Sequence, residues 1–164
     1  MPLEIKKLRF KIFDLVPLII LFIISLNGLS TFDIKYFSIN INYIIVYYWV
    51  LRKPQALGYG YIFIAGIITD VVFALPIGAN ALTLLILASA ASYVRVVTVR
   101  ISLLNDWLSF IPALLFANFV YFLILYFSGY SIEYLYLFKN SIFTFIFYPV
   151  LWTGFTVLLN LMRS

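Results

Sequence analysis

Runs of apolar residues alternate with short polar breaks along the chain. A helix needs about 20 mostly apolar residues to cross a bilayer core roughly 30 Å thick. The pattern predicts six transmembrane helices, over about 13–29, 37–51, 58–75, 79–94, 107–127 and 141–161. We therefore expect an all-α integral membrane protein in which residues 1–164 form a single transmembrane domain.

Prolines, glycines and charges mark the breaks between these runs. Arg52, Lys53 and Pro54 end the second span, because two charges and a proline cannot continue a lipid-facing helix. The triplet 76–78, Pro-Ile-Gly, predicts a tight turn between the third and fourth spans. The stretch 30–42 is polar and alternating, so we expect an exposed connection there that forms a short extended segment.

The first apolar run follows a basic segment, as the core of a signal peptide would. Its end, SLNGL at 25–29, lacks the Ala-x-Ala pattern of a cleavage site. We therefore expect a retained first helix.

Composition excludes a water-soluble monomer. Hydrophobic residues make up 65% of the chain and charged residues 10%, whereas a soluble domain carries roughly 25% charged residues. In a soluble protein, 11 Lys and Arg against 6 Asp and Glu would suggest nucleic-acid binding. Here the basic residues are distributed over several loops, so we expect no nucleic-acid partner.

The distribution of basic residues indicates the topology. With six spans, both termini lie on one side, together with most of the basic residues: Lys6, Lys7, Arg9, Lys11, Arg52, Lys53, Arg95, Arg100 and Arg163. Only Lys35 and Lys139 fall on the other side. Short cytoplasmic loops carry an excess of Lys and Arg, so we expect both termini to be cytoplasmic.

The sequence contains no catalytic constellation. It has no cysteine and no histidine, which excludes disulfides, thiol nucleophiles, imidazole bases and Cys/His metal sites. Paired carboxylates, a P-loop and a GxGxxG sequence are also missing. We expect a protein that is not an enzyme and needs no cofactor or metal.

Asp70 is the one acid that falls well inside a predicted span. A charge there is costly, so two interpretations arise: a carboxylate that handles a proton or a ligand, or a structural carboxylate satisfied by hydroxyls or backbone amides near the turn.

Small residues surround Asp70 on its helix and on the next one. Residues spaced by four form one stripe on the third span, and a similar stripe lies on the fourth: Gly58, Ile62, Gly66, Asp70 and Ala74, then Ala81, Leu85, Ala88 and Ser92. Small residues let transmembrane backbones approach closely, which predicts a tightly packed hairpin. In the last span, Pro149 is expected to kink the helix and open a seam that a partner fills.

The segment 49–92 resembles the MreD family of bacterial rod shape-determining membrane proteins. The resemblance rests on the basic-Pro loop Arg52, Lys53 and Pro54, then on Gly66-x-x-x-Asp70, and then on Gly78 followed by Ala81 and Leu82. The last span, with Pro149 and a closing basic residue, is also similar to that family. The resemblance covers roughly 37–163.

This resemblance implies a non-enzymatic scaffold of the cell-elongation machinery in the bacterial cytoplasmic (inner) membrane. MreD-like proteins bind the membrane-anchored periplasmic protein MreC, and work with the filament protein MreB, the glycosyltransferase RodA and a class B penicillin-binding protein in lateral peptidoglycan synthesis. The family is similar in fold to substrate-binding subunits of energy-coupling-factor transporters. By position, Gly66, Asp70 and Gly78 would shape the third–fourth hairpin, and Pro149 the last helix.

An alternative is a small-molecule, vitamin-like binding or transport subunit. The shared fold suggests it, as do Asp70, Asn118 and Asn160 within predicted spans. Vitamin-binding subunits commonly carry an Ala-x-x-x-Ala pattern in the first helix, whereas 15–29 contains no alanine.

Overall fold

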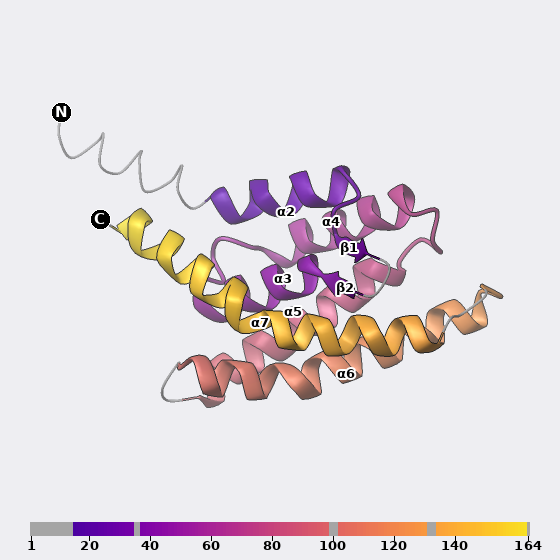
Figure 1. The fold of residues 1–164 in the computed structure, drawn as a ribbon. Helices are drawn as coiled ribbons and strands as arrows, with labels where there is room; N and C mark the ends of the chain where they lie inside the picture. Colours follow the sequence, from indigo (N-terminus) through magenta and orange to yellow (C-terminus); the bar gives the residue numbers. More distant parts are fainter. Residues whose placement is uncertain (1–14, 35–36, 99–101, 131–133, 164) are drawn as a thin grey trace.

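The computed structural model describes residues 15–34, 37–98, 102–130 and 134–163 (Figure 1). Its elements, in chain order, are α2 (Val16–Leu26), β1 (Thr31–Ile34), β2 (Phe37–Asn40), α3 (Ile41–Arg52), α4 (Tyr59–Val72), α5 (Ala79–Val97), α6 (Leu103–Phe127) and α7 (Tyr134–Arg163). Within these ranges the chain is helical apart from loops and one two-stranded hairpin, so the expected all-α architecture is largely confirmed. Residues 1–14, which include the first two residues of the predicted first span, lie outside the described residues.

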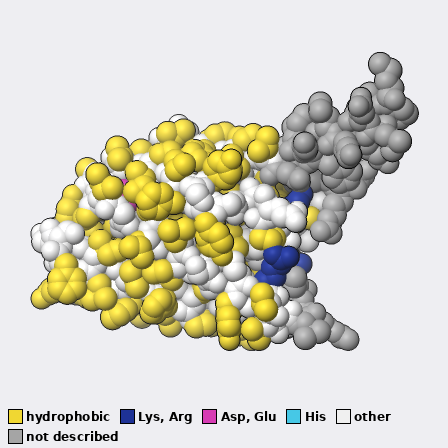
Figure 2. Space-filling view, turned by 180° about the vertical axis from the view of Figure 1, so that it is seen from behind, with side chains coloured by type: hydrophobic (Ala, Val, Ile, Leu, Met, Phe, Trp, Pro, Cys, Tyr) yellow, Lys and Arg dark blue, Asp and Glu magenta, His cyan; other side chains and the backbone are white. Residues whose placement is uncertain are grey.

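Three helices in the described part of the chain are long and apolar enough to cross a membrane: Ala79–Val97, Leu103–Phe127 and Leu135–Leu161. The helices α2 and α4 are apolar but shorter. Figure 2 shows apolar side chains along the whole of one face, with Lys and Arg gathered at one end of it. The structure thus has the surface of a membrane protein, while the count of six spans stays a prediction.

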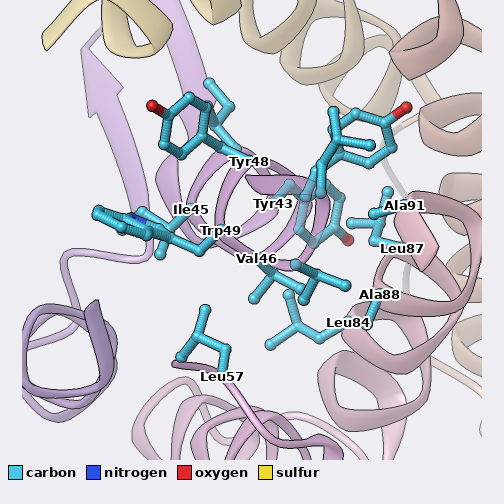
Figure 3. Packing of buried hydrophobic residues seen from close by; sticks show 14 of the residues in the cluster. Tyr43, Ile45, Val46, Tyr48, Trp49, Leu57, Leu84, Leu87, Ala88 and Ala91 are labelled. Carbon is cyan, nitrogen blue, oxygen red and sulfur yellow. The ribbon is translucent and has the colours of Figure 1, made fainter. Parts of the chain in front are cut away.

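Helix α3 forms the centre of the molecule. Every residue from Asn42 to Leu51 is buried. Figure 3 shows its side chains leaving in several directions, with Tyr43 and Val46 turned toward Leu84 and other residues of α5. A helix that is apolar all round is buried on all sides, which explains why this segment shows no clear polar face.

The hairpin of β1 and β2 continues the path of α3. A helix of 12 residues is about 18 Å long, well short of a bilayer core of roughly 30 Å. The two strands pair antiparallel from Thr31 opposite Asn40 to Ile34 opposite Phe37. The ring of Phe37 packs on α7, 4.8 Å from the ring of Phe143. Strand β2 is largely buried against α7, whereas most of β1 is exposed.

Two predictions for this region are therefore wrong. The second helix begins at Ile41, because the side chain of Asn40 caps it by accepting a hydrogen bond from the amide of Tyr43 at 3.2 Å. Residues 37–40 belong to β2 instead of a span. The expected extended segment exists, but Ser38 and Ile39 in it are buried, because β2 lies against α7.

The remaining boundaries differ by a few residues. Helix α4 ends at Val72, where 75 was expected, and α5 continues to Val97 beyond the expected 94. Helix α6 starts at Leu103 instead of 107, because Ser102 caps it and accepts from the amide of Asn105 at 3.3 Å. Helix α7 starts at Tyr134 instead of 141. In Figure 1, α6 and α7 run side by side, and α2 lies on the opposite side of α3.

Candidate functional site

Asp70 lies at the end of α4 and fastens the start of α5. Its side chain is completely buried. One carboxylate oxygen, Oδ2, accepts the amide of Gly78 at 2.8 Å, and the other, Oδ1, accepts both the backbone amide of Asn80 at 2.8 Å and its side-chain amide at 2.9 Å. Three hydrogen bonds thus offset the free-energy cost of removing this carboxylate from water. This arrangement corresponds to the structural interpretation of Asp70.

The turn that brings these donors to Asp70 has an unusual backbone. Gly78 has φ of 102°, a conformation that favours glycine. Ala74 adopts φ of 51°, and the amide of Leu75 closes α4 on the carbonyl of Asp70 at 2.8 Å. The hydroxyl of Tyr130, at the end of α6, donates to the carbonyl of Ala74. Contacts from three segments therefore hold the turn in place.

Gly66 is the point of closest approach between α4 and α5. A Cβ atom at this position would lie 2.3 Å from the Cα and 2.6 Å from the backbone nitrogen of Ala81. Van der Waals contact between carbon atoms needs about 3.5–4.0 Å, so only glycine fits. The centres of the two predicted stripes, Ile62, Gly66 and Asp70 on α4 with Ala81 and Ala88 on α5, are all buried. Gly58 and Ala74 at the ends of the first stripe are more exposed.

Pro149 lies in α7, away from the Asp70 turn, and creates a different contact. A proline has no N–H group, so the carbonyl four residues earlier, that of Phe145, loses its helical partner. The indole Nε1 of Trp107 in α6 donates to that carbonyl at 2.9 Å. The rings of Trp107 and Phe145 also stack, with centroids 4.9 Å apart. The proline thus fastens α7 to α6 at this level.

Replacing Trp107 by phenylalanine tests this contact. The variant keeps an aromatic ring but leaves the carbonyl of Phe145 unpaired, so we expect a loss of about 1–2 kcal/mol in the free energy of unfolding. Titration with sodium dodecyl sulfate in mixed micelles measures it. In a Pro149→Ala background, where the carbonyl regains its helical partner, the same change should cost less. An equal loss in both backgrounds would contradict the explanation.

A second buried acid, Asp106, lies in the first turn of α6 and was missed by the sequence analysis, which placed only Asp70 within a span. Its side chain is 1% exposed, and Oδ2 accepts from the guanidinium of Arg52 at 3.1 Å and from the indole of Trp152 at 2.9 Å. The guanidinium carbon of Arg52 also lies 5.0 Å from the ring centre of Trp152. Arg52, expected to mark topology, therefore also joins α3, α6 and α7.

We expect Arg52→Lys to destabilise the protein by about 1 kcal/mol, because lysine keeps the charge but lacks the flat guanidinium that lies over Trp152. Thermal unfolding in detergent measures the change. Lys53→Arg, at the neighbouring position of the same loop, is the matched control and should leave stability close to that of the wild type. A melting temperature unchanged by Arg52→Lys would argue against the stacking contact.

The other residues of the basic loop end α3. The amide of Lys53 donates to the carbonyl of Trp49 at 2.6 Å, and Pro54 follows directly after this last helical bond. The sequence-predicted site residues therefore fall into three places. Gly66, Asp70 and Gly78 meet in the α4–α5 hairpin, Pro149 lies between α6 and α7, and the 52–54 loop closes the central helix.

A partly open polar cavity of about 220 Å³ lies next to the Asp70 turn, between the β1–β2 hairpin and α4, α5, α6 and α7. Most of the residues that line it carry hydroxyl or amide groups: Ser30, Thr31, Asp33, Asn40, Tyr43, Thr69, Phe73, Leu75, Asn80, Asn118, Tyr121, Tyr136, Leu137 and Asn140. Asp33 is the only acid among these described residues, and none of them is Lys or Arg. The sequence analysis singled out Asn118 but not the cavity, because its walls come from separate segments.

Asp70 and the cavity share a wall. Asn80 lines the cavity, and both its backbone amide and its side-chain amide donate to Oδ1 of Asp70. Asn118 reaches the cavity from α6, whereas Asn160, near the end of α7, is exposed and does not line it. Of the three polar residues that suggested a small-molecule site, one therefore lines the cavity directly and one supports its wall.

Among the described residues, no group of three His, Cys, Asp or Glu side chains could hold a metal ion. No protein-family model, curated protein or solved structure matches the chain.

Proposed function

We propose that this protein is a non-enzymatic membrane scaffold of the bacterial elongation machinery, which binds MreC and supports rod-shape maintenance and lateral peptidoglycan synthesis. The observation that carries the proposal is the hairpin of α4 and α5. The residues that hold this hairpin together, Gly66, Asp70 and Gly78, are also the residues on which the resemblance to the MreD family rests. The printed contacts of these residues hold the hairpin together, which agrees with a scaffold role.

The proposed location is the bacterial cytoplasmic membrane, with several spans and both termini in the cytoplasm. Arg52 and Lys53 end α3, and Arg95 lies in the last turn of α5. The start of α4 and the end of α5 meet at the same end of the molecule, where the hydroxyls of Tyr59 and Ser92 lie 2.7 Å apart. The basic side chains at one end of the apolar face in Figure 2 agree with an inner surface there.

The proposed binding surface for MreC is an apolar groove between α6 and α7. It has a volume of about 440 Å³ and is lined by Ile111, Leu114, Leu115, Phe138, Ser141, Ile142, Phe145 and Ile146. Side chains of this kind pack against a single transmembrane helix at bilayer depth, with Ser141 as the one small residue that lets a partner backbone approach. MreC, which is anchored in the membrane, offers such a helix. RodA, MreB and the class B penicillin-binding protein are the further partners that the resemblance implies.

Co-purification tests this function. MreC expressed with the protein should be recovered with it in mild detergent, and Leu115→Trp, which fills the groove from a side chain that is 60% exposed, should lower that recovery several-fold. Ile19→Trp, on the exposed face of α2, is the matched control. If MreC is not recovered while the wild-type protein stays monodisperse, the proposal is wrong.

The alternative function, a small-molecule binding or transport subunit, has one observation in its favour, the polar cavity beside Asn80 and Asn118.

A further inference from the structure

Ser30, at the edge of the polar cavity, has a buried hydroxyl that finds no partner in the described part of the chain. Its residue is 2% exposed, and its carbonyl is held by the amide of Ile41 at 2.8 Å. Among the described residues, no group hydrogen-bonds to its Oγ. A buried polar atom without a partner costs folding free energy. Because Ser30 lines the cavity, rotation of this hydroxyl toward a molecule in the cavity would supply the missing bond.

Three asparagines present a common chemistry to the same cavity. The side-chain amides donate to protein oxygens: Asn80 to Asp70 at 2.9 Å, Asn118 to Ser141 at 2.7 Å and Asn140 to Ser38 at 2.7 Å. These bonds fix the orientation of each amide and use one of the two N–H groups on its nitrogen. Since the other end of each amide is a carbonyl oxygen, these side chains are suited to accept hydrogen bonds from O–H or N–H groups of a bound molecule.

Charge and size define the class of that molecule. None of its described lining residues is Lys or Arg, so these residues supply no positive charge that would favour an anion over a neutral molecule. Its one carboxylate, Asp33, is exposed and already accepts from the hydroxyl of Tyr136 at 2.7 Å, so a cation gains little there. A volume of about 220 Å³ exceeds that of an engineered cavity in another protein, about 150 Å³, which holds benzene.

We propose that this cavity binds a small uncharged organic molecule that carries hydroxyl or amide groups and is somewhat larger than benzene. Ser30, Asn118 and Asn140 bond to its polar groups, and the ring of Tyr121 covers its apolar surface. Thr31 and Asp33 of β1 and Asn40 of β2 form one wall of the cavity. This inference does not depend on MreC binding, because the cavity and the α6–α7 groove share no lining residue.

Thermal unfolding of the purified full chain in detergent tests the proposal. The neutral probes are nicotinamide, uracil, xylitol and glucose at millimolar concentrations, since a ligand that binds the folded state raises the melting temperature with its concentration. Nicotinate and 3-(aminomethyl)pyridine have the shape of nicotinamide but carry a negative and a positive charge. We expect at least one neutral probe to raise the melting temperature and the two charged ones to have at most a tenth of the effect. Native mass spectrometry of the purified protein should show the corresponding adduct.

Ser30→Ala removes the unpartnered hydroxyl, so the unliganded variant should fold as well as the wild type while its affinity for the active probe falls at least fivefold. Tyr121→Ala, which removes the ring that covers the apolar surface of the ligand, serves as a second variant with the same expected loss. Ser89→Ala, at an exposed hydroxyl of α5 that bonds only within its own helix turn at 2.8 Å, should bind like the wild type. The proposal is overturned if no neutral probe and no native adduct is detected, if the charged probes bind equally well, or if both cavity variants bind like the wild type. Recovery of MreC is measured on the same variants, so the two proposals fail separately.

Discussion

Gly66→Ala is expected to lower the free energy of unfolding by about 2–4 kcal/mol. The added Cβ would lie 2.3 Å from the Cα of Ala81, and no side-chain rotation can move either atom away. To relieve the contact, α4 and α5 must separate by more than about 1 Å, which also stretches the bonds from Asp70 to the start of α5. Overpacking of this kind outweighs the gain in helix propensity, about 1 kcal/mol, that alanine brings.

Gly60→Ala is the matched control for this change. Gly60 lies in the same helix, and nothing lies within 4 Å of the position of its Cβ, so the substitution should be neutral or stabilising by up to about 1 kcal/mol. Unfolding in mixed micelles, followed by tryptophan fluorescence, measures both variants. If Gly66→Ala is as stable as Gly60→Ala, the close approach of the two helices does not exist in the protein.

The α4–α5 hairpin is the part of the site that the sequence predicts best. The residues that determine its packing lie close together in the sequence. A spacing of four on each helix places Gly66 and Ala81 on facing sides, and the turn 76–78 makes the two helices neighbours. The carboxylate of Asp70 finds its donors within ten residues. Geometry that is encoded within one hairpin can be worked out from the pattern of residue sizes alone.

The central helix could not be predicted with its correct start, because burial on all sides removes the signal that marks a boundary. From Phe37 to Leu51 the residues are mostly apolar in both strand and helix. What decides the break is the pairing of Phe37 with Ile34 in β1 and the packing of its ring on Phe143, more than a hundred residues later. The polar cap Asn40 was the one local indication.

Asp106 was missed for a similar reason. Its position four residues after Ser102, a capping residue, was a readable sign that α6 starts early enough to include it. Its ion pair with Arg52 and its bond from Trp152 span 54 and 46 residues of sequence. The polar cavity depends on even more distant segments, since Ser30 and Asn140 both line it. Sites assembled across several helices follow from the fold and not from any one pattern.

Asp70→Asn is expected to cost about 3 kcal/mol of unfolding free energy. The carboxylate accepts three hydrogen bonds, from the amide of Gly78 and from two donors of Asn80. An asparagine keeps one acceptor oxygen, and its NH2 group must face another donor, so at least one buried N–H loses its partner. The negative charge at the start of α5 is lost as well, and with it a favourable interaction with the helix dipole. Mixed-micelle unfolding measures the change.

The same substitution at Asp33, an exposed acid with one bond to Tyr136, is the matched control and should cost less than about 1 kcal/mol. A double-mutant cycle with Asn80→Ala should give a coupling energy of about 1–3 kcal/mol, because the two residues share their bonds. A structural role for Asp70 also requires that MreC recovery fall only as far as stability does. If the Asp70→Asn variant instead has the unfolding free energy of the wild type but no longer retains MreC, the carboxylate acts in recognition and the structural interpretation is wrong.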